Sequence, residues 1–162
     1  MILVVGAKGG VGTTQVAYEL ARASQAVALD LADGQLAARL ERTTWSLGWF
    51  VFVTATQRRE MVETIVQRRG TLLWAAECNL RRESTWSTIR DIAHRRPVVI
   101  DGGIAPPEEA GQWSEQVVIV STDHAVARWH ERQLQTRFPR AVVVSGTPEA
   151  ARTLAVQLFK SS

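Results

Sequence analysis

The sequence has 162 residues, of which 46% are hydrophobic and 22% are charged, and it carries a formal net charge of +3. This composition fits one compact domain, residues 1–162, and excludes a disordered or low-complexity chain. The apolar runs Ile2–Val5 and Leu47–Val53 are far shorter than the roughly 20 residues that span a bilayer, and the N-terminus lacks a signal-peptide pattern. We therefore expect a cytoplasmic protein with no integral membrane segment. The single cysteine, Cys78, excludes an intrachain disulfide and a cysteine-based zinc site.

Short apolar runs alternate with longer amphipathic stretches along the chain. The runs predict strands at Ile2–Val5, Ala26–Leu31, Thr71–Ala75, Val98–Ile100, Val117–Val120 and Ala141–Val144. The amphipathic stretches predict helices at Thr14–Ala23, Asp33–Arg42, Arg59–Arg69, Thr85–His94, Glu108–Ser114, Ala125–Arg137 and Pro148–Phe159. The stretch Trp45–Val53 is ambiguous, because Phe50–Val53 fits either a strand or part of a buried helix. Because the strands are continuously apolar, we expect them to be buried on both faces of a mostly parallel sheet, in a three-layer α/β/α domain.

A glycine-rich segment, GAKGGVGTTQ, joins the first predicted strand to the first predicted helix. A strand, a glycine loop and a helix in this order form the context of a phosphate-binding loop. Gly9, Gly10 and Gly12 let the backbone turn its N–H groups inward. The start of the following helix adds the positive end of its dipole. The segment therefore predicts a site for the phosphates of a nucleotide.

The loop departs from the general pattern G-x-x-x-x-G-K-[ST] at two positions. Ala7 stands at the first glycine, and Thr13 stands at the lysine. Thr14 keeps the hydroxyl that such loops offer to Mg²⁺. Without the lysine, a point charge normally placed on the β and γ phosphates is lost. We expect nucleotide binding to survive this loss better than hydrolysis.

The loop AKGGVGTT resembles the deviant Walker A loop of the MinD/ParA ATPases, x-K-G-G-x-G-K-[ST]. Among these it is similar to the loops of CpaE/TadZ proteins of Tad-pilus systems, and cellulose-synthesis ParA-like proteins carry similar loops. The segments VALDLADGQ, PVVIDGG, EQVVIVSTDHAV and RAVVVSGTP are similar to later strands of the same family. The resemblance implies that the chain binds ATP with Mg²⁺ and forms a nucleotide-dependent homodimer, in which Lys8 reaches the phosphates of the partner. The residues that it assigns to the nucleotide are Lys8, Gly9, Gly10, Val11, Gly12, Thr13 and Thr14.

Two aspartates at strand ends complete the predicted site. Asp30 ends the second strand and Asp101 follows Val98–Ile100, so with Thr14 they form a plausible Mg²⁺ site, held largely through water. Hydrolysis also needs a group that orients the attacking water. The resemblance assigns this role to the second aspartate of a D-x-D segment, where this chain has Ala32, with Asp33 one residue later.

Lys8 and Asp33 are therefore the predicted catalytic residues. A helix cap is an equally good interpretation of Asp33. Whether the chain is an enzyme stays open at this point, as a possible weak ATPase.

Three functional hypotheses follow. The first is a MinD/ParA-like protein that binds ATP, dimerises, and positions a larger assembly such as a pilus, a secretion machine or a plasmid, with weak or absent hydrolysis. The second is an interaction module with a remnant loop, which binds a protein partner or nucleic acid through Trp45–Val53 or through paired arginines. The pairs, which could hold DNA phosphates without sequence preference, are Arg58-Arg59, Arg68-Arg69, Arg81-Arg82 and Arg95-Arg96. A ligase or amidotransferase-type enzyme is less favoured, because the short chain leaves little room for a substrate-binding insertion.

Overall fold

A computed structural model describes residues 1–31, 35–40, 45–46, 72–75, 83–94 and 96–159. The strands are β1 (Ile2–Gly6), β2 (Val27–Asp30), β3 (Trp45–Ser46), β4 (Leu72–Ala75), β5 (Val98–Asp101), β6 (Gln116–Ser121) and β7 (Val142–Ser145). The helices are α1 (Thr13–Ser24), α2 (Gln35–Leu40), α5 (Glu83–Ala93), α6 (Glu108–Trp113), α7 (Ala125–Arg137) and α8 (Pro148–Phe159).

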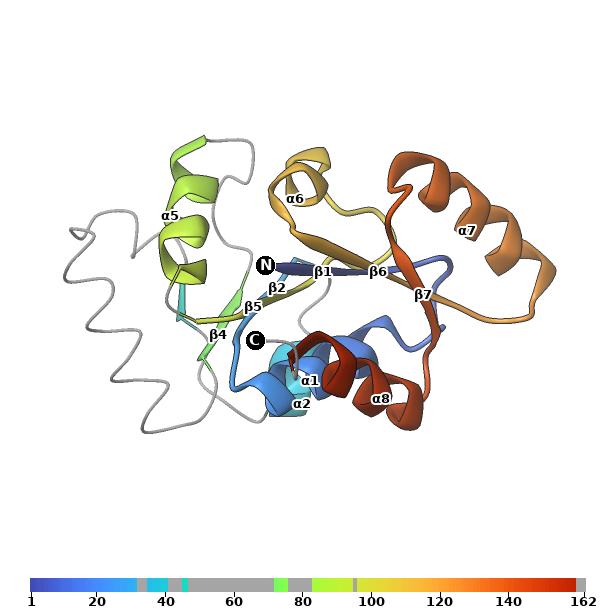
Figure 1. Ribbon diagram of the computed structural model, residues 1–162, viewed down its shortest axis with the longest axis horizontal. Helices are drawn as coiled ribbons and strands as arrows, with labels where there is room; N and C mark the ends of the chain where they lie inside the picture. The colour runs from blue at the N-terminus through green and yellow to red at the C-terminus, as the bar shows by residue number, and fades with distance from the viewer. Residues whose placement is uncertain (32–34, 41–44, 47–71, 76–82, 95, 160–162) are drawn as a thin grey trace.

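The strands form one seven-stranded sheet in the order β3-β4-β2-β5-β1-β6-β7, and each neighbouring pair runs parallel. In Figure 1, α1, α2 and α8 lie on one side of the sheet, and α5, α6 and α7 lie on the other. The predicted three-layer α/β/α class and the parallel sheet are thereby confirmed. Because all strands run the same way, the loops that follow them gather along one edge of the sheet.

The predicted elements agree closely with the observed ones. The helices Ala125–Arg137 and Pro148–Phe159 match residue for residue, and the boundaries of the other described elements shift by one or two residues. In the ambiguous stretch, Trp45–Ser46 is a strand, and residues 47–53 lie outside the described part of the chain. The helix predicted at Arg59–Arg69 also lies outside it.

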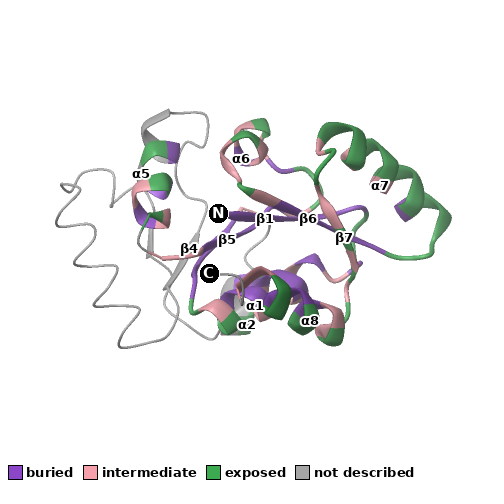
Figure 2. Cartoon of the chain, in the orientation of Figure 1, coloured by how far each residue is buried: buried purple, intermediate pink, exposed green. Residues whose placement is uncertain are grey.

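The core follows the centre of the sheet (Figure 2), where β1, β2 and β5 are buried along their whole length. The prediction that every strand is buried on both faces is wrong for β7, where half-buried and exposed residues alternate. The reason is that β7 lies at the edge of the sheet, because it pairs with β6 and is the last strand in the sheet order. None of the described helices is long and apolar enough to cross a membrane.

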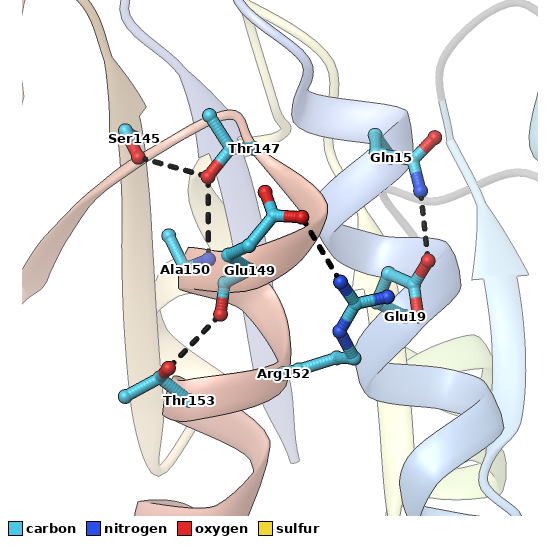
Figure 3. Close-up of polar contacts among 8 residues, drawn as sticks. All are labelled: Gln15, Glu19, Ser145, Thr147, Glu149, Ala150, Arg152 and Thr153. Atoms are coloured by element: carbon cyan, nitrogen blue, oxygen red, sulfur yellow. Dashed lines mark hydrogen bonds and ion pairs between the residues drawn. The ribbon is translucent and has the colours of Figure 1, made fainter.

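Helix α1 holds the site against the core. Its buried side is formed by Thr13, Val16, Ala17, Leu20 and Ala21, and the last four of these are the apolar face that the sequence predicts. Helix α8 lies beside α1 and begins with a capped first turn (Figure 3). There the Ala150 N–H donates to Thr147 Oγ1 at 3.2 Å. The α8 start is therefore fixed next to the loop that feeds α1.

Candidate nucleotide-binding site

The glycine loop has the backbone shape that a bound anion requires. Gly10 and Gly12 have φ angles of 77° and 91°, in the left-handed region that favours glycine. Gly12 is the N-cap residue of α1, and it makes no side-chain cap hydrogen bond. The first N–H groups of a helix have no partner within the helix. At α1 they are left for a ligand, and the helix dipole favours an anion there.

Backbone hydrogen bonds tie the start of the loop to the sheet on both sides. The Gly6 N–H donates to the Gly103 carbonyl at 2.7 Å, and the Ala7 N–H donates to the Val120 carbonyl at 2.9 Å. In return, the Gly102 N–H donates to the Val4 carbonyl at 2.9 Å. The loop after β5 and the end of β6 thus fix where the glycine loop leaves β1. A site built here is held by the sheet itself.

Thr13, which replaces the expected lysine, is buried under the loop. A Cβ atom built on Gly6 would come within 2.2 Å of Thr13 Oγ1. The threonine hydroxyl therefore lies against the Gly6 backbone, and only glycine fits at position 6. Sequence reasoning missed this role of Gly6, whose signal is a glycine that ends an apolar strand. A long lysine side chain is replaced here by a short side chain that packs inside the loop.

A cavity of about 500 Å³ opens over the loop. It is lined by Lys8, Gly9, Gly10, Gly12, Thr13, Thr14, Gln15, Leu31, Gln35, Arg39 and residues 102–105. All but one of the loop residues assigned to the nucleotide are brought together here. The exception is Val11, which is 6% exposed and belongs to the hydrophobic core. Among the described residues, the lining contains two cations, Lys8 and Arg39, and no carboxylate. Such a lining suits an anionic ligand.

Asp30 and Asp101 are register partners on adjacent strands, so they lie side by side, at the ends of β2 and β5. Both are buried, with 3% and 0% of their surface exposed. Asp30 Oδ2 accepts from the Leu36 N–H at 3.1 Å, and Asp101 Oδ1 accepts from the Gly103 N–H at 3.2 Å. Each carboxylate therefore anchors a segment that lines the cavity. Asp30 thus holds the start of α2 against the end of β2.

The predicted Mg²⁺ ligands fit the metal by their chemistry. Thr14 lines the cavity, and Asp30 and Asp101 lie at the strand ends below it. Hydroxyl and carboxylate oxygens are the donors that Mg²⁺ takes, usually with several waters retained. Within the residues that the structure describes, no group of three or more His, Cys, Asp or Glu side chains could hold a metal ion. Ala32 and Asp33, the positions considered for the attacking water, lie outside those residues.

The loop after β7 packs directly on the glycine loop. A Cβ atom on Gly146 would lie 1.7 Å from the Val11 carbonyl oxygen, and one on Gly12 would lie 2.5 Å from the Gly146 carbonyl oxygen. The two backbones therefore touch, and each needs a glycine. This contact was not predicted from the sequence. The signal for the packing role is the glycine one residue after an apolar strand.

Sequence reasoning also missed two polar side chains of the cavity. Gln15 follows the loop directly on α1, and Arg39 lies on α2. The Arg39 guanidinium donates through Nη1 to Gln15 Oε1. The position of Gln15 after the loop is a signal that could have been used. Nothing in the sequence pattern singles out Arg39.

Comparison with known proteins supports the fold. No protein-family model matches the sequence, and no curated protein matches it. Among solved structures, it is similar to the ParA family ATPase from Chlorobium tepidum TLS, with a TM-score of 0.62 and 16% identity over 99% of this chain and 92% of the other. It is also similar to the MinC:MinD cell division protein complex of Aquifex aeolicus, with a TM-score of 0.57 and 17% identity over 88% of this chain and 66% of the other. The chain therefore has the α/β fold of the MinD/ParA-like P-loop ATPases.

Proposed function

We propose that this protein binds ATP with Mg²⁺, dimerises when it does so, and positions a larger assembly, with weak or absent hydrolysis. The observation that carries the proposal is the cavity over the glycine loop. It joins an uncapped helix N-terminus to two cations, and no carboxylate is found among its described lining residues. A polyphosphate matches that arrangement in charge and in hydrogen bonding.

Lys8 supports the dimerisation step. Its side chain is exposed at the mouth of the cavity, and among the described residues it forms no ion pair. An exposed cation in the loop is available to a phosphate held by a second copy of the chain. We infer that nucleotide binding creates the contact that joins two subunits.

Slow or absent hydrolysis follows from the buried threonine in the loop. Thr13 places a packed hydroxyl where the general pattern has a lysine charge. Less stabilisation of the developing charge means a slower reaction. Binding depends on backbone groups and cavity charge, so it is affected less.

The positioning role rests on the structural neighbours. One is a ParA family ATPase, and the other is a MinD found with MinC in a cell division protein complex. By analogy, we propose that a protein partner or cargo is bound by the nucleotide-loaded dimer. The similarity of the loop to CpaE/TadZ proteins makes a pilus or secretion machine the preferred cargo, and a plasmid the next.

The first test measures ATP–Mg²⁺ binding by calorimetry, and oligomeric state by gel filtration with light scattering, with a phosphate-release assay beside them. We expect micromolar binding, a dimer that forms only with ATP–Mg²⁺, and little phosphate release. Thr14→Ala should weaken binding about tenfold or more, since it removes an oxygen contact to the bound metal. Lys8→Ala should abolish the dimer.

The matched control is Arg152→Ala, which removes an exposed cation that pairs with Glu149 on α8 (Figure 3) and does not line the cavity. It should bind ATP and dimerise as the unaltered protein does. If the unaltered protein binds no nucleotide in the presence of Mg²⁺, the proposal is wrong. Rapid phosphate release would refute the weak-hydrolysis part alone.

A second candidate function, the interaction module with a remnant loop, is favoured by one surface. Helix α7 buries Ala127 alone and exposes Val126 and Trp129, the latter by 52%. The segment first considered for this role, Trp45–Val53, lies outside the described residues apart from Trp45–Ser46, and so do all the paired arginines except Arg96. Dimerisation that does not respond to nucleotide would favour this function, and DNA binding would fall steeply with salt.

A further inference from the structure

The glycine loop lacks the lysine charge of the general pattern, but another positively charged side chain lines the same cavity. Thr13 packs against Gly6 and brings no charge to the phosphates. The cavity nevertheless contains a second cation besides Lys8, namely Arg39, which comes from α2. A guanidinium has five N–H donors and stays protonated, so it suits phosphate oxygens.

Arg39 is oriented by a short chain of hydrogen bonds from α1. Its Nη1 donates to Gln15 Oε1, and Gln15 Nε2 donates to Glu19 Oε1 at 3.0 Å. Because Glu19 engages the amide nitrogen, the amide oxygen of Gln15 faces Arg39. Gln15 is the residue directly after Thr14, so the guanidinium is held next to the end of the loop.

The helix that carries Arg39 is itself fixed to the sheet. The Leu36 N–H donates to the buried Asp30 Oδ2, and the Leu36 side chain is fully buried in the core. Arg39 lies three residues after Leu36, within one helical turn. Its backbone position is therefore set by the same aspartate that ends β2.

The described residues do not neutralise the charge of Arg39. In the described part of the chain no carboxylate forms an ion pair with it, and its one recorded partner is the neutral amide of Gln15. The side chain is exposed to the cavity side of the molecule. A charged group held in place beside an anion site, with most of its donors unused, is suited to a ligand.

We propose that Arg39 binds the phosphate chain of the nucleotide and replaces, from α2, the charge that the loop lacks at Thr13. Gln15 acts as its positioning residue. The inference rests on the proposed nucleotide binding and deepens it. It supplies a physical reason for a loop with Thr13 to bind a nucleotide: the cation reaches the phosphates from a neighbouring helix.

The test is a set of calorimetric titrations with ATP–Mg²⁺. Arg39→Ala should weaken binding by about 10- to 100-fold, the usual effect of losing a hydrogen-bonded charge. Arg39→Lys should keep part of the affinity. The matched control is Arg22→Ala, which removes an exposed arginine of α1 that bonds to Tyr18 Oη at 3.1 Å and does not line the cavity. It should leave the affinity unchanged.

Three further variants test whether Arg39 replaces the lysine charge that the loop lacks, and whether Gln15 positions it. Thr13→Lys, made in the Arg39→Ala background, should restore ATP affinity to within a few-fold of the unaltered protein, because it returns the charge to the loop. Thr13→Lys alone should gain little. Gln15→Leu should reduce affinity less than Arg39→Ala, since it only loosens the orientation of the guanidinium.

The outcomes separate this inference from the proposed function. If the unaltered protein binds no nucleotide, both are wrong. If it binds and Arg39→Ala binds equally well, only the role of Arg39 is wrong. If Thr13→Lys does not restore ATP affinity in the Arg39→Ala background, and this double variant melts at the temperature of the unaltered protein, Arg39 does not replace the missing lysine charge. Equal losses in Arg39→Ala and Arg39→Lys, with lower melting temperatures in both, would show a structural role instead.

Discussion

Two cavities of similar size open along the edge where the strands end. One, of about 500 Å³, lies over the glycine loop after β1, and the other, of about 460 Å³, lies where β6 and β7 end beside α7. In the part of the chain that the structure describes, the first is lined by two cations and no carboxylate. The second has Arg128 and Arg132 but also Asp123 and Glu131. Charge balance, not size, therefore distinguishes them.

In the second cavity, the positive charge of the arginines is offset by acidic side chains of the same lining. Arg128 donates through Nη2 to Asp123 Oδ1 at 2.6 Å, so one of its cations is already paired. In the first cavity, Arg39 meets a neutral amide instead. The backbone differs as well, because the first cavity opens on an uncapped helix start, whereas His124 Nδ1 caps α7 by accepting from the Val126 N–H. The comparison favours the first cavity for the anion site that we propose.

The largest expected effect comes from the packing beneath the first cavity. Gly146→Ala places a methyl group on the Val11 carbonyl oxygen and must displace the glycine loop. Unfolding in denaturant should show a loss of about 1–3 kcal/mol, the usual cost of overpacking, and ATP binding should fall below detection. Gly9→Ala is the control for stability, since its added Cβ meets no atom within 4 Å. Normal ATP binding by Gly146→Ala would contradict the observed contact between the two loops.

A smaller effect is expected when the charge of the first cavity is changed directly. Ile104 lines that cavity and is 61% exposed, so it is not part of the hydrophobic core. Ile104→Glu adds a carboxylate and should weaken ATP binding about 3- to 10-fold, as exposed charges interact by about 1 kcal/mol. Ile104→Gln has the same shape without the charge and should bind normally. If both variants bind alike at low salt, charge balance does not define the site.

The smallest effect is expected in the second cavity. Arg128→Ala breaks an exposed ion pair with Asp123, and the change in unfolding free energy should stay within about 0.5 kcal/mol. ATP affinity should not change, because this cavity lies apart from the glycine loop. Thermal unfolding and calorimetry check both statements. A clear loss of ATP affinity would place part of the nucleotide on the α7 side.

Much of the architecture was readable from the sequence. Apolar runs and helical periodicity located the described strands and helices other than β3 within two residues, because local patterning reflects burial. The glycine loop could be predicted as a phosphate site because its residues are contiguous, and that assignment stays a prediction. The apolar run of β7 was misinterpreted, since an edge strand and a central strand can have the same composition.

The candidate site, like the fold, combines features that the sequence predicted with features that only the structure revealed. By itself, the sequence determined the loop and the two strand-end aspartates, which lie in segments with strong local signals. Only the tertiary structure decided the contact of Gly146 with Val11, the anchoring of α2 by Asp30, and the meeting of Arg39 with Gln15. Gln15 and Arg39 are 24 residues apart, and Val11 and Gly146 lie on opposite sides of the chain's midpoint. Such pairs meet only because parallel strands bring their following loops to one edge, and no local pattern encodes which loops become neighbours.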